Sequence, residues 1–434
     1  MDGDGTGSRI DAAYRARTPG SASTMGRASL CMPSGITRSL SWFAPYPVVF
    51  ESGSGAELID IDGNRYLDFM LNGLSLVHGH AYPPVMEAIA AAMSRGTVWP
   101  GASDAQIEFA ELVCGRVAKG SQVRFTNTGT EATMLAVKLA RAVTGRPMVV
   151  KAVGGYHGSF DDLEAGLHGR GELPGRVALA EFGDIASFEA ALERHAGQVA
   201  AVIIEPVMYT DPVVAPPEGF LPALERATRE AGALFILDDC LMFRLAEGGS
   251  AELFGLKPDL TALGKWIGGG LPIGAVVGAP ELMAAFDPHG PSPLYHGGSF
   301  NGNLLSCVAG RIAVSDLTAS AIEEMNVKAA RMRSALEAGA AAAGLPIVIR
   351  GEGAALGIYV VRVDGGIDWP LTKLMHLAGT THGVYLGTGG ELALSTVATD
   401  EQVDRASEAL SQAFVDVAEE IERSGRLERE ESLS

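Results

Sequence analysis

The chain has few cysteines and no long hydrophobic run. Its four cysteines show no paired spacing, so the sequence predicts neither a disulfide framework nor a zinc site: Cys31, Cys114, Cys240 and Cys307. No apolar run is long enough to span a membrane, and no secretory signal opens the chain. We therefore expect a cytoplasmic protein without a metal centre.

Positive charge is also scarce. The chain carries 33 Lys and Arg against 52 Asp and Glu, a formal net charge of −19. This balance argues against nucleic acid and against anionic membranes as partners. With 434 residues, 47% of them hydrophobic, the chain can bury a large core, which is usually divided between two domains.

The order of predicted elements indicates an α/β fold. From about residue 80 to about residue 315 strands and helices alternate, which is typical of a mostly parallel sheet with helices on both faces. The segments before and after this region predict a smaller α+β domain built from both chain ends. We predict poor order for 1–28, a small domain from 29–75 and 319–422, a large domain over 76–318, and a charged tail at 423–434.

A turn rich in threonine joins a short strand to a helix in the first part of the large domain. Val123 to Thr126 predicts a buried strand, and Thr130 to Arg141 is rich in helix formers. Between them, the Thr128-Gly129-Thr130 turn places hydroxyls and free N–H groups at a helix N-terminus. Such a turn favours a bound anion, phosphate above all, although an ordinary turn with a capping threonine has the same pattern.

Polar or aromatic side chains are also expected just beyond or at the ends of two other predicted strands. The run Gly155-Tyr156-His157-Gly158 follows a predicted strand, and an aromatic ring between glycines suits stacking on a flat ligand. The apolar stretch from Ala233 ends in Asp238, at the carboxyl edge of the sheet where α/β proteins bind ligands. A buried carboxylate there needs a cationic or hydrogen-bonding partner; a helix-capping aspartate is the alternative.

Lys265 is the most informative position. It ends the apolar run Thr261-Ala262-Leu263 and is flanked by Gly264 and by the triplet 268–270. Glycines allow close backbone approach, and a lysine held there can act as a nucleophile that forms a Schiff base. Taken alone, the pattern fits a surface lysine in a glycine-rich turn equally well.

The ordered series of phosphate turn, aromatic, strand-end acid and glycine-flanked lysine resembles the fold-type I pyridoxal-phosphate enzymes. More narrowly, it resembles the class III aminotransferases, in the branch that contains glutamate-1-semialdehyde aminomutase. The resemblance runs from about Met32 to about Phe414. It includes the segment 298–303, whose family counterpart carries a threonine that reaches the phosphate of the neighbouring subunit; Ser299 stands at that place here.

The resemblance implies a cofactor, a role for each of these residues, and a homodimer with its active site at the subunit interface. Pyridoxal 5′-phosphate would be held on Lys265 as an aldimine, with Asp238 at the ring nitrogen and Tyr156 over the ring face. Thr128, Gly129 and Thr130, together with Ser299 of the partner subunit, would bind the phosphate. The implied reaction moves an amino group from a carboxylated amine, with β-amino acids as one candidate class, to a keto-acid acceptor.

Several departures from the family pattern leave the reaction open. The sequence after Asp238 is one residue shorter than usual, reading Asp239-Cys240, and Met208-Tyr209 stands where relatives place polar residues near the cofactor. Alternatives on the same scaffold are an intramolecular 2,1-aminomutase, a racemase or a decarboxylase, and a catalytically silent cofactor-holding partner. For the substrate carboxylate, Arg38 matches an arginine that relatives use, while Arg244 could instead pair with Glu247 on the surface.

Overall fold

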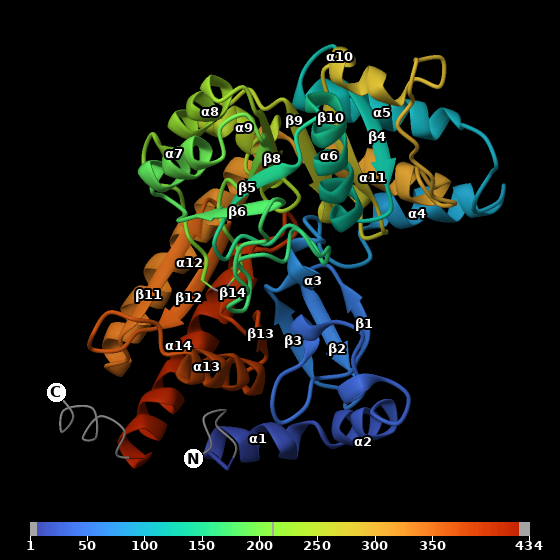
Figure 1. Ribbon diagram of the computed structural model, residues 1–434. Helices are drawn as coiled ribbons and strands as arrows, with labels where there is room; N and C mark the ends of the chain where they lie inside the picture. The colour runs from blue at the N-terminus through green and yellow to red at the C-terminus, as the bar shows by residue number, and fades with distance from the viewer. Residues whose placement is uncertain (1–6, 211, 425–434) are drawn as a thin grey trace. The chain divides into compact units, whose positions relative to one another are not determined.

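The computed structural model describes residues 7–210 and 212–424, which form two compact units (Figure 1). The large unit consists of Leu74–Val77 and Pro83–Ile322. The small unit consists of the residues up to Gly73, His78–Tyr82, and the residues from Glu323 onward. The sequence predicts residues 76 and 318 as the limits of the large domain.

A mostly parallel sheet of seven strands forms the centre of the large unit, as predicted. Its spatial order is β4-β10-β9-β8-β7-β5-β6. The strands are β4 (Gln122–Thr126), β5 (Met148–Ala152), β6 (Val177–Ala180), β7 (Val199–Ile204), β8 (Leu234–Asp238), β9 (Leu260–Gly264) and β10 (Gly274–Gly278). All neighbours are parallel except β10, which runs antiparallel to both β4 and β9. Strands β5, β7, β9 and β10 are buried along their whole length, which explains their nearly continuous apolar sequences.

Helices cover both faces of this sheet (Figure 1). They are α4 (Pro83–Met93), α5 (Asp104–Val117), α6 (Gly129–Thr144), α7 (Ile185–Arg194), α8 (Phe220–Glu230), α9 (Gly249–Phe254), α10 (Pro280–Met283) and α11 (Leu304–Asp316), with 3-10 turns η3 (Met242–Arg244), η4 (Lys265–Gly268) and η5 (Ala284–Phe286). Alternate residues of β8 point to opposite faces: Phe235 packs with α7 and α8, whereas Ile236 packs with α6. The two cores leave the carboxyl ends of the parallel strands free to carry polar residues.

The small unit combines segments from both ends of the chain. One sheet pairs β1 (Phe50–Ser54), β2 (Glu57–Asp60) and β3 (Arg65–Asp68) with β13 (Val384–Tyr385), and a second contains β11 (Ile347–Glu352), β12 (Ala355–Val360) and β14 (Glu391–Ala393). Its helices are α1 (Arg9–Arg17), α2 (Pro19–Ala28), most of α12 (Ala319–Ala343), α13 (Trp369–Thr381) and α14 (Asp400–Ser424), with 3-10 turns η1 (Pro33–Gly35) and η2 (Ser39–Ser41). The short turn α3 (Leu71–Leu74) has positive φ throughout. Because β13 pairs with β3, distant parts of the sequence share one sheet.

The structure corrects the prediction of poor order for the part of 1–28 that it describes. Residues 7–28 contain α1 and α2, and Tyr14 is fully buried, with its hydroxyl donating to the carbonyl of Tyr46. The Asp62 carboxylate accepts from the backbone N–H groups of Gly20 and Ser21 at the start of α2. This long-range cap satisfies helix N–H groups that local composition leaves without a partner. Residues 1–6 and most of the predicted tail lie outside the described residues.

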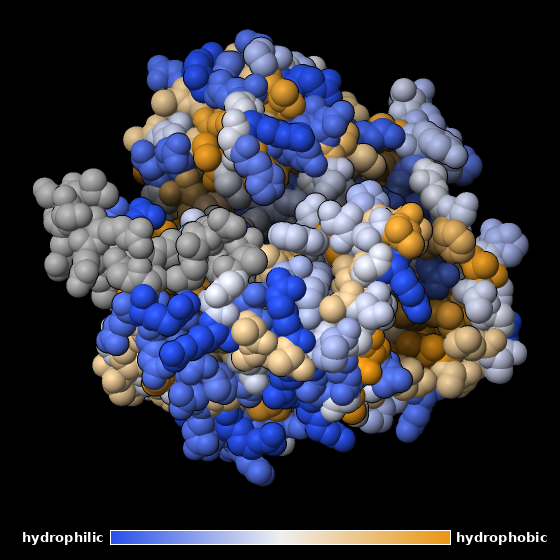
Figure 2. All heavy atoms as spheres, turned by 90° about the horizontal axis from the view of Figure 1, so that it is seen from below, coloured by the Kyte–Doolittle hydropathy of each residue, from blue (hydrophilic) through white to orange (hydrophobic). Residues whose placement is uncertain are grey.

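The surface carries scattered apolar side chains among polar ones. Figure 2 shows one face on which hydrophilic residues predominate and hydrophobic residues form small groups, an ordinary pattern for a protein surface. Among the described residues, no helix is by itself long and apolar enough to span a membrane; α11 and α12 meet that criterion only as a bent pair. All four cysteines are free thiols.

His376 of α13 gives the small unit a testable sensitivity to acid. It is 1% exposed and packs against the ring of Phe43, with 4.5 Å between ring centroids. Burial lowers the pKa of His376 from 6.5 to about 4, so the unfolded chain binds a proton in this range and the folded chain does not. Neutral His376 therefore contributes to the free energy of unfolding above pH 6.5, and this contribution is lost as the pH falls towards 4. The loss amounts to about 3 kcal/mol, at about 1.4 kcal/mol per pKa unit.

We expect His376→Met to flatten this part of the pH profile of the unfolding free energy. His289→Met, at an exposed histidine, is the matched control and should leave the profile unchanged. The check is urea unfolding of both variants and the parent between pH 4 and 7. A His376→Met profile parallel to that of the parent would contradict the assignment.

Candidate active site

The turn between β4 and α6 has the geometry of an anion site. Thr128 is the N-cap of α6, and its side chain accepts from the N–H of Glu131 at 3.1 Å. The Glu131 carboxylate in turn accepts from the backbone N–H of Asn127 at 2.7 Å, a variant of the capping box. The turn is thus fixed from both sides, and the positive end of a 16-residue helix begins at Gly129.

Two other motifs pack directly onto this turn. A Cβ added at Gly158 would lie 2.5 Å from Thr130 Oγ1, and one added at Gly264 would lie 3.0 Å from Gly129 Cα. Only glycine permits such an approach, and Gly158 also has a φ of +97°, which side chains rarely adopt. The aromatic motif and the lysine loop therefore meet the threonine turn in one place, although they are far apart in sequence.

A buried acid with a histidine partner lies at the end of β8. The Asp238 carboxylate contacts His157 Nδ1 at 2.8 Å and accepts from the backbone N–H of Cys240 at 3.2 Å. Burial alone would raise the pKa of Asp238, but the hydrogen bond with His157 and the nearby charges hold the pKa below its ordinary value. Burial lowers the pKa of His157, with Asp238 acting in the opposite direction, and Nδ1 is the ring nitrogen that faces the carboxylate, where an N–H donates.

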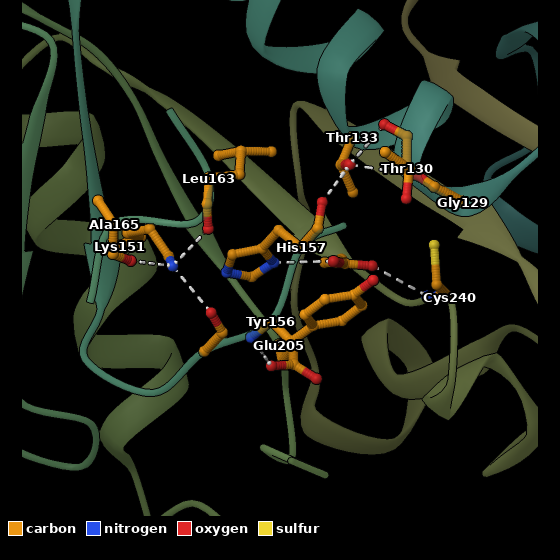
Figure 3. A network of polar contacts seen from close by, with 12 residues as sticks. Gly129, Thr130, Thr133, Lys151, Tyr156, His157, Leu163, Ala165, Glu205 and Cys240 are labelled. Atoms are coloured by element: carbon orange, nitrogen blue, oxygen red, sulfur yellow. Dashed lines mark hydrogen bonds and ion pairs between the residues drawn. The ribbon is translucent and has the colours of Figure 1, made fainter. Parts of the chain in front are cut away.

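Tyr156 and Glu205 complete the buried polar cluster. The backbone N–H of Tyr156 donates to Glu205 Oε2 at 2.8 Å. Burial, and the negative charge of Asp238, raise the pKa of Glu205 to about 8. Figure 3 shows Tyr156, His157 and Glu205 gathered between Lys151 on one side and Cys240 on the other. Glu205 is therefore largely protonated at neutral pH, beside the ionised Asp238.

Lys265 lies at the start of η4, directly after β9, and has a strained backbone. Its φ of 53° is in the left-handed region, which costs a residue other than glycine about 1–3 kcal/mol. Its positive charge lowers the pKa of both Asp238 and Glu205, so the three groups share one electrostatic environment. Strain of this kind persists only where surrounding packing imposes it and is frequent at functional sites.

The structure places the two remaining predicted residues elsewhere. Ser299 lines a cavity of about 590 Å³ with Trp99 and Gln106, and this cavity does not include the threonine turn. The segment of Ser299 still reaches the neighbourhood of the turn, because Asn127 Nδ2 donates to Asn301 Oδ1 at 2.8 Å. Arg38 belongs to the small unit, where its side chain is exposed and its Nε donates to Ser41 Oγ. The roles of Ser299 and Arg38 remain predictions.

The structure brings to this cluster three groups for which the sequence predicts no role: His157, Glu205 and Lys151. His157 belongs to the run Gly155-Tyr156-His157-Gly158. Glu205 directly follows the apolar strand β7, just as Asp238 ends β8, and this position indicates a site residue. Lys151 is a charged residue inside the apolar strand β5. An ionisable residue in or directly after a buried strand is the signal shared by Lys151 and Glu205, whereas His157 lies five residues beyond β5.

The residues at the departures from the family pattern have defined contacts. Asp239 accepts from the backbone N–H and the hydroxyl of Ser250, so the second acid of the pair fixes the start of α9. Met208 exchanges two backbone hydrogen bonds with Val214. Arg244 is only 2% exposed, so its proposed surface pairing with Glu247 is wrong; Glu247 lies 3.9 Å from Arg116 instead.

Comparison with known proteins identifies relatives of the whole architecture. The model of the aminotransferase class-III family matches residues 41–165 and 177–414. A glutamate-1-semialdehyde 2,1-aminomutase of Chloroflexus aurantiacus is 35% identical over 424 residues, covering 90% of this chain and 95% of the relative. A beta-phenylalanine transaminase of Variovorax paradoxus is 33% identical over 388 residues, covering 86% and 88%.

Solved structures agree with these matches. An omega-transaminase from Sphaerobacter thermophilus superimposes with a TM-score of 0.87 at 34% identity, covering 93% of this chain and 99% of that one. A transaminase with PLP bound gives a TM-score of 0.88 at 32% identity, with the same coverage. These neighbours confirm the predicted fold-type I architecture.

Proposed function

Because the chain belongs to the class III aminotransferases, we propose that it transfers the amino group of a carboxylated amine to a keto acid with pyridoxal 5′-phosphate as cofactor. The observation that supports this most is the convergence of four motifs in the large unit. A capped helix N-terminus, a buried acid, an aromatic residue and a strained lysine meet around the close contacts of Gly158 and Gly264. Each feature alone is common, whereas their combination fits one cofactor.

The residues of this cluster match the parts of that cofactor. Thr128, Gly129 and Thr130 would hold its phosphate at the N-terminus of α6, where backbone N–H groups and the helix dipole favour an anion. Asp238, kept ionised by its environment, would hold a proton on the ring nitrogen. Tyr156 would cover one face of the ring. When bound, the cofactor supplies a sink for the electrons left on the amine-bearing carbon.

Lys265 has two tasks in this proposal. Its Nζ would hold the cofactor covalently in the resting enzyme and would leave it when a substrate amine arrives. The freed Nζ would then accept the proton of the amine-bearing carbon as a general base. The positive φ of Lys265 fixes where the side chain leaves the backbone, directly after the buried strand β9.

Substitution at Gly158 tests the fit between the aromatic motif and the threonine turn. We expect Gly158→Ala to weaken cofactor binding by about tenfold or more, because the added Cβ collides with Thr130. Gly154→Ala is the matched control: its φ is +76°, so it carries similar backbone strain, but nothing lies within 4 Å of the added Cβ. Titration of both apo-proteins with the cofactor measures the difference. Equal losses would show that strain alone is responsible.

The substrate assignment rests on relatives and on Arg38. A β-amino acid is the donor class suggested by the beta-phenylalanine transaminase, and the carboxylate of such a donor would pair with Arg38. A second candidate is the intramolecular 2,1-amino transfer of a glutamate-1-semialdehyde aminomutase. It is favoured by the 35% identity over 90% of the chain to an enzyme of that name.

Arg38→Ala distinguishes carboxylate binding from general positioning. We expect KM for carboxylated amines to rise by about tenfold to a hundredfold, the size of one charge-assisted contact, while simple amines keep their KM. Steady-state rates with one donor of each kind measure this effect. Arg27→Ala, at another exposed arginine of the small unit, is the control. An equal rise for both donor kinds would remove Arg38 from carboxylate recognition.

We also propose a cytoplasmic homodimer. Ser299 lies outside the cluster formed by its own chain, and exposed apolar residues flank it, which suits a contact with the phosphate bound by a second copy. Four free thiols suit a reducing compartment. Sedimentation of the purified protein tests the dimer, and a monomer with full activity would contradict it.

Two observations distinguish the candidate reactions: which donor converts the cofactor-loaded protein, and whether turnover requires a keto acid. The cofactor-loaded protein is mixed with an α-amino acid, a β-amino acid or glutamate-1-semialdehyde, and its visible absorbance is followed before a keto acid is added. Conversion by one amino acid, reversed by the keto acid, supports the aminotransferase. Turnover of the semialdehyde without any keto acid supports the aminomutase instead. A loaded protein that no donor converts would contradict both.

A further inference from the structure

Lys151 is an ammonium group inside the central sheet. It lies in β5, where it pairs with Leu179 of β6 and Ile203 of β7, and it is 0% exposed. Its Nζ donates to the carbonyls of Gly155 at 2.8 Å, Leu163 at 2.8 Å and Ala165 at 2.6 Å, as the dashed lines in Figure 3 show. An ammonium has three donors and no acceptor, so three carbonyls satisfy it completely.

A charge at this position needs a reason, because the sheet itself does not require one. The flanking residues Val150 and Ala152 are fully buried, and an apolar side chain would fill the same space without the cost of desolvating a charge. Burial lowers the pKa of Lys151 only to about 8, with Glu205 acting in the opposite direction, so the group is still charged at neutral pH. What the ammonium provides, and an apolar side chain could not, is the three hydrogen bonds to carbonyl groups.

All three carbonyls belong to one irregular loop, which we define as the loop 153–166. Gly155 lies near its start, and Leu163 and Ala165 lie near its end, so one side chain joins both ends. The loop has turns and bends but no helix or strand, and its glycines at 154, 158 and 166 have positive φ. Other bonds also hold it: the Gly154 N–H donates to the carbonyl of Gly166 at 3.1 Å, and the Asp162 carboxylate binds Arg141 and Arg176. Lys151 adds a single side chain whose donors reach the carbonyls of Gly155, Leu163 and Ala165 together.

The loop 153–166 carries the two residues that face the proposed cofactor ring and its acid. Tyr156 follows Gly155 directly, and its N–H is held by Glu205 at 2.8 Å. His157 is held at its ring by Asp238 and at its carbonyl by the hydroxyl of Thr133 at 2.6 Å. Lys151 therefore binds the two ends of the loop, whereas Glu205, Asp238 and Thr133 bind its middle, at Tyr156 and His157.

We propose that Lys151 is a positioning residue, whose ammonium ties both ends of the loop 153–166 and so keeps Tyr156 and His157 in place. It touches neither Asp238 nor the threonine turn through any bond within the described residues. Its bonds act on the site through the loop, and its positive charge in addition lowers the pKa of His157 and of Glu205. This inference rests on the proposed function in one respect only, namely that the loop faces the cofactor.

The experiment compares three variants in two measurements. Lys151→Met removes the charge and the donors at similar length, Lys151→Arg restores a charge with a different donor geometry, and Lys328→Met is the matched control. Lys328 also donates to a carbonyl, that of Ala398, but lies in the small unit. The first measurement is hydrogen exchange of the cofactor-free full chain, resolved by peptide. The second is the dissociation constant for added pyridoxal 5′-phosphate.

We expect Lys151→Met to speed exchange selectively in the loop 153–166 and to weaken cofactor binding, each by about tenfold or more. Lys151→Arg should recover part of both effects, and Lys328→Met should match the parent. Parent-like exchange in the loop, or equal acceleration throughout the large unit, would overturn the proposal. If Lys151→Met does not fold, intermediate exchange confined to the loop in Lys151→Arg supports the proposal, and parent-like exchange overturns it.

The two measurements also separate this inference from the proposed function. If the parent protein fails to bind the cofactor, the proposed function is wrong. The exchange experiment on the cofactor-free chain still decides whether Lys151 holds the loop.

Discussion

We expect replacement of Lys265 with alanine to abolish the proposed covalent attachment of the cofactor and to reduce transamination by at least about 10³-fold. The proton transfer assigned to Nζ is worth about 10²–10⁴-fold by itself, and the covalent contribution is lost with it. The fold should be retained, because Lys265 projects from a strained turn and β9 before it is buried without help from this side chain. The measurements are the visible spectrum of the reconstituted variant and its rate with the best donor.

The control for this prediction is Lys257→Ala. Lys257 is exposed, and its side chain has no part in the cluster, so its removal should leave both the spectrum and the rate unchanged. If Lys265→Ala kept the spectrum of the parent, another lysine would hold the cofactor and the assignment of the site would fail.

The second large effect is expected at Asp238. Asp238→Asn keeps the shape of the side chain but removes the negative charge that would hold a proton on the ring nitrogen. We expect kcat to fall by about 10²–10³-fold, the size typical of losing one preorganised electrostatic contact at a reacting centre. Cofactor binding should survive, because the phosphate turn and Lys265 are untouched. Single-turnover rates with a saturating donor measure the chemical step directly.

Asp239→Asn is a control in the adjacent position. Asp239 is equally buried, but its carboxylate binds the backbone and hydroxyl of Ser250, and burial raises its pKa to about 7. Its replacement should lower stability through the start of α9 and leave the chemical step nearly unchanged. Equal kinetic losses at both positions would mean that the charge of Asp238 has no special role.

The part of the site that could be predicted from sequence lies where polar residues interrupt apolar strands. Asp238 and Lys265 each stand at the end of a run that reads as a buried strand, and parallel strands bring such ends to one edge. The threonine turn was predictable because helix capping has a local signature at Thr128 and Glu131. The residues next to Asp238, Lys265 and Thr128 in the sequence are therefore enough to predict where these three lie in the fold.

The rest of the site depends on packing between strands that are distant in sequence. The bond between His157 and Asp238 joins residues 81 positions apart, and the bond between Tyr156 and Glu205 spans 49. No local pattern specifies such partners. Lys151 was missed for a related reason, since the carbonyls that satisfy it belong to a loop whose path the sequence does not determine.

The N-terminal helices α1 and α2 also could not be predicted from local sequence, because their order depends on distant residues. The composition of 1–28 resembles that of disordered segments, yet α1 and α2 are held by Tyr46 and by Asp62, which caps α2 from 41 and 42 positions away. Composition indicates whether a segment is ordered in isolation. Here the contacts with Tyr46 and Asp62 order the segment within the fold.

The most direct test of the central claim is to locate the cofactor on the chain. The protein is loaded with pyridoxal 5′-phosphate, reduced with borohydride to fix any lysine-bound cofactor, digested, and analysed by peptide mass spectrometry. We expect a single modified peptide that contains Lys265. Modification at another lysine, such as Lys151, or no modification of a protein that binds the cofactor, would contradict it.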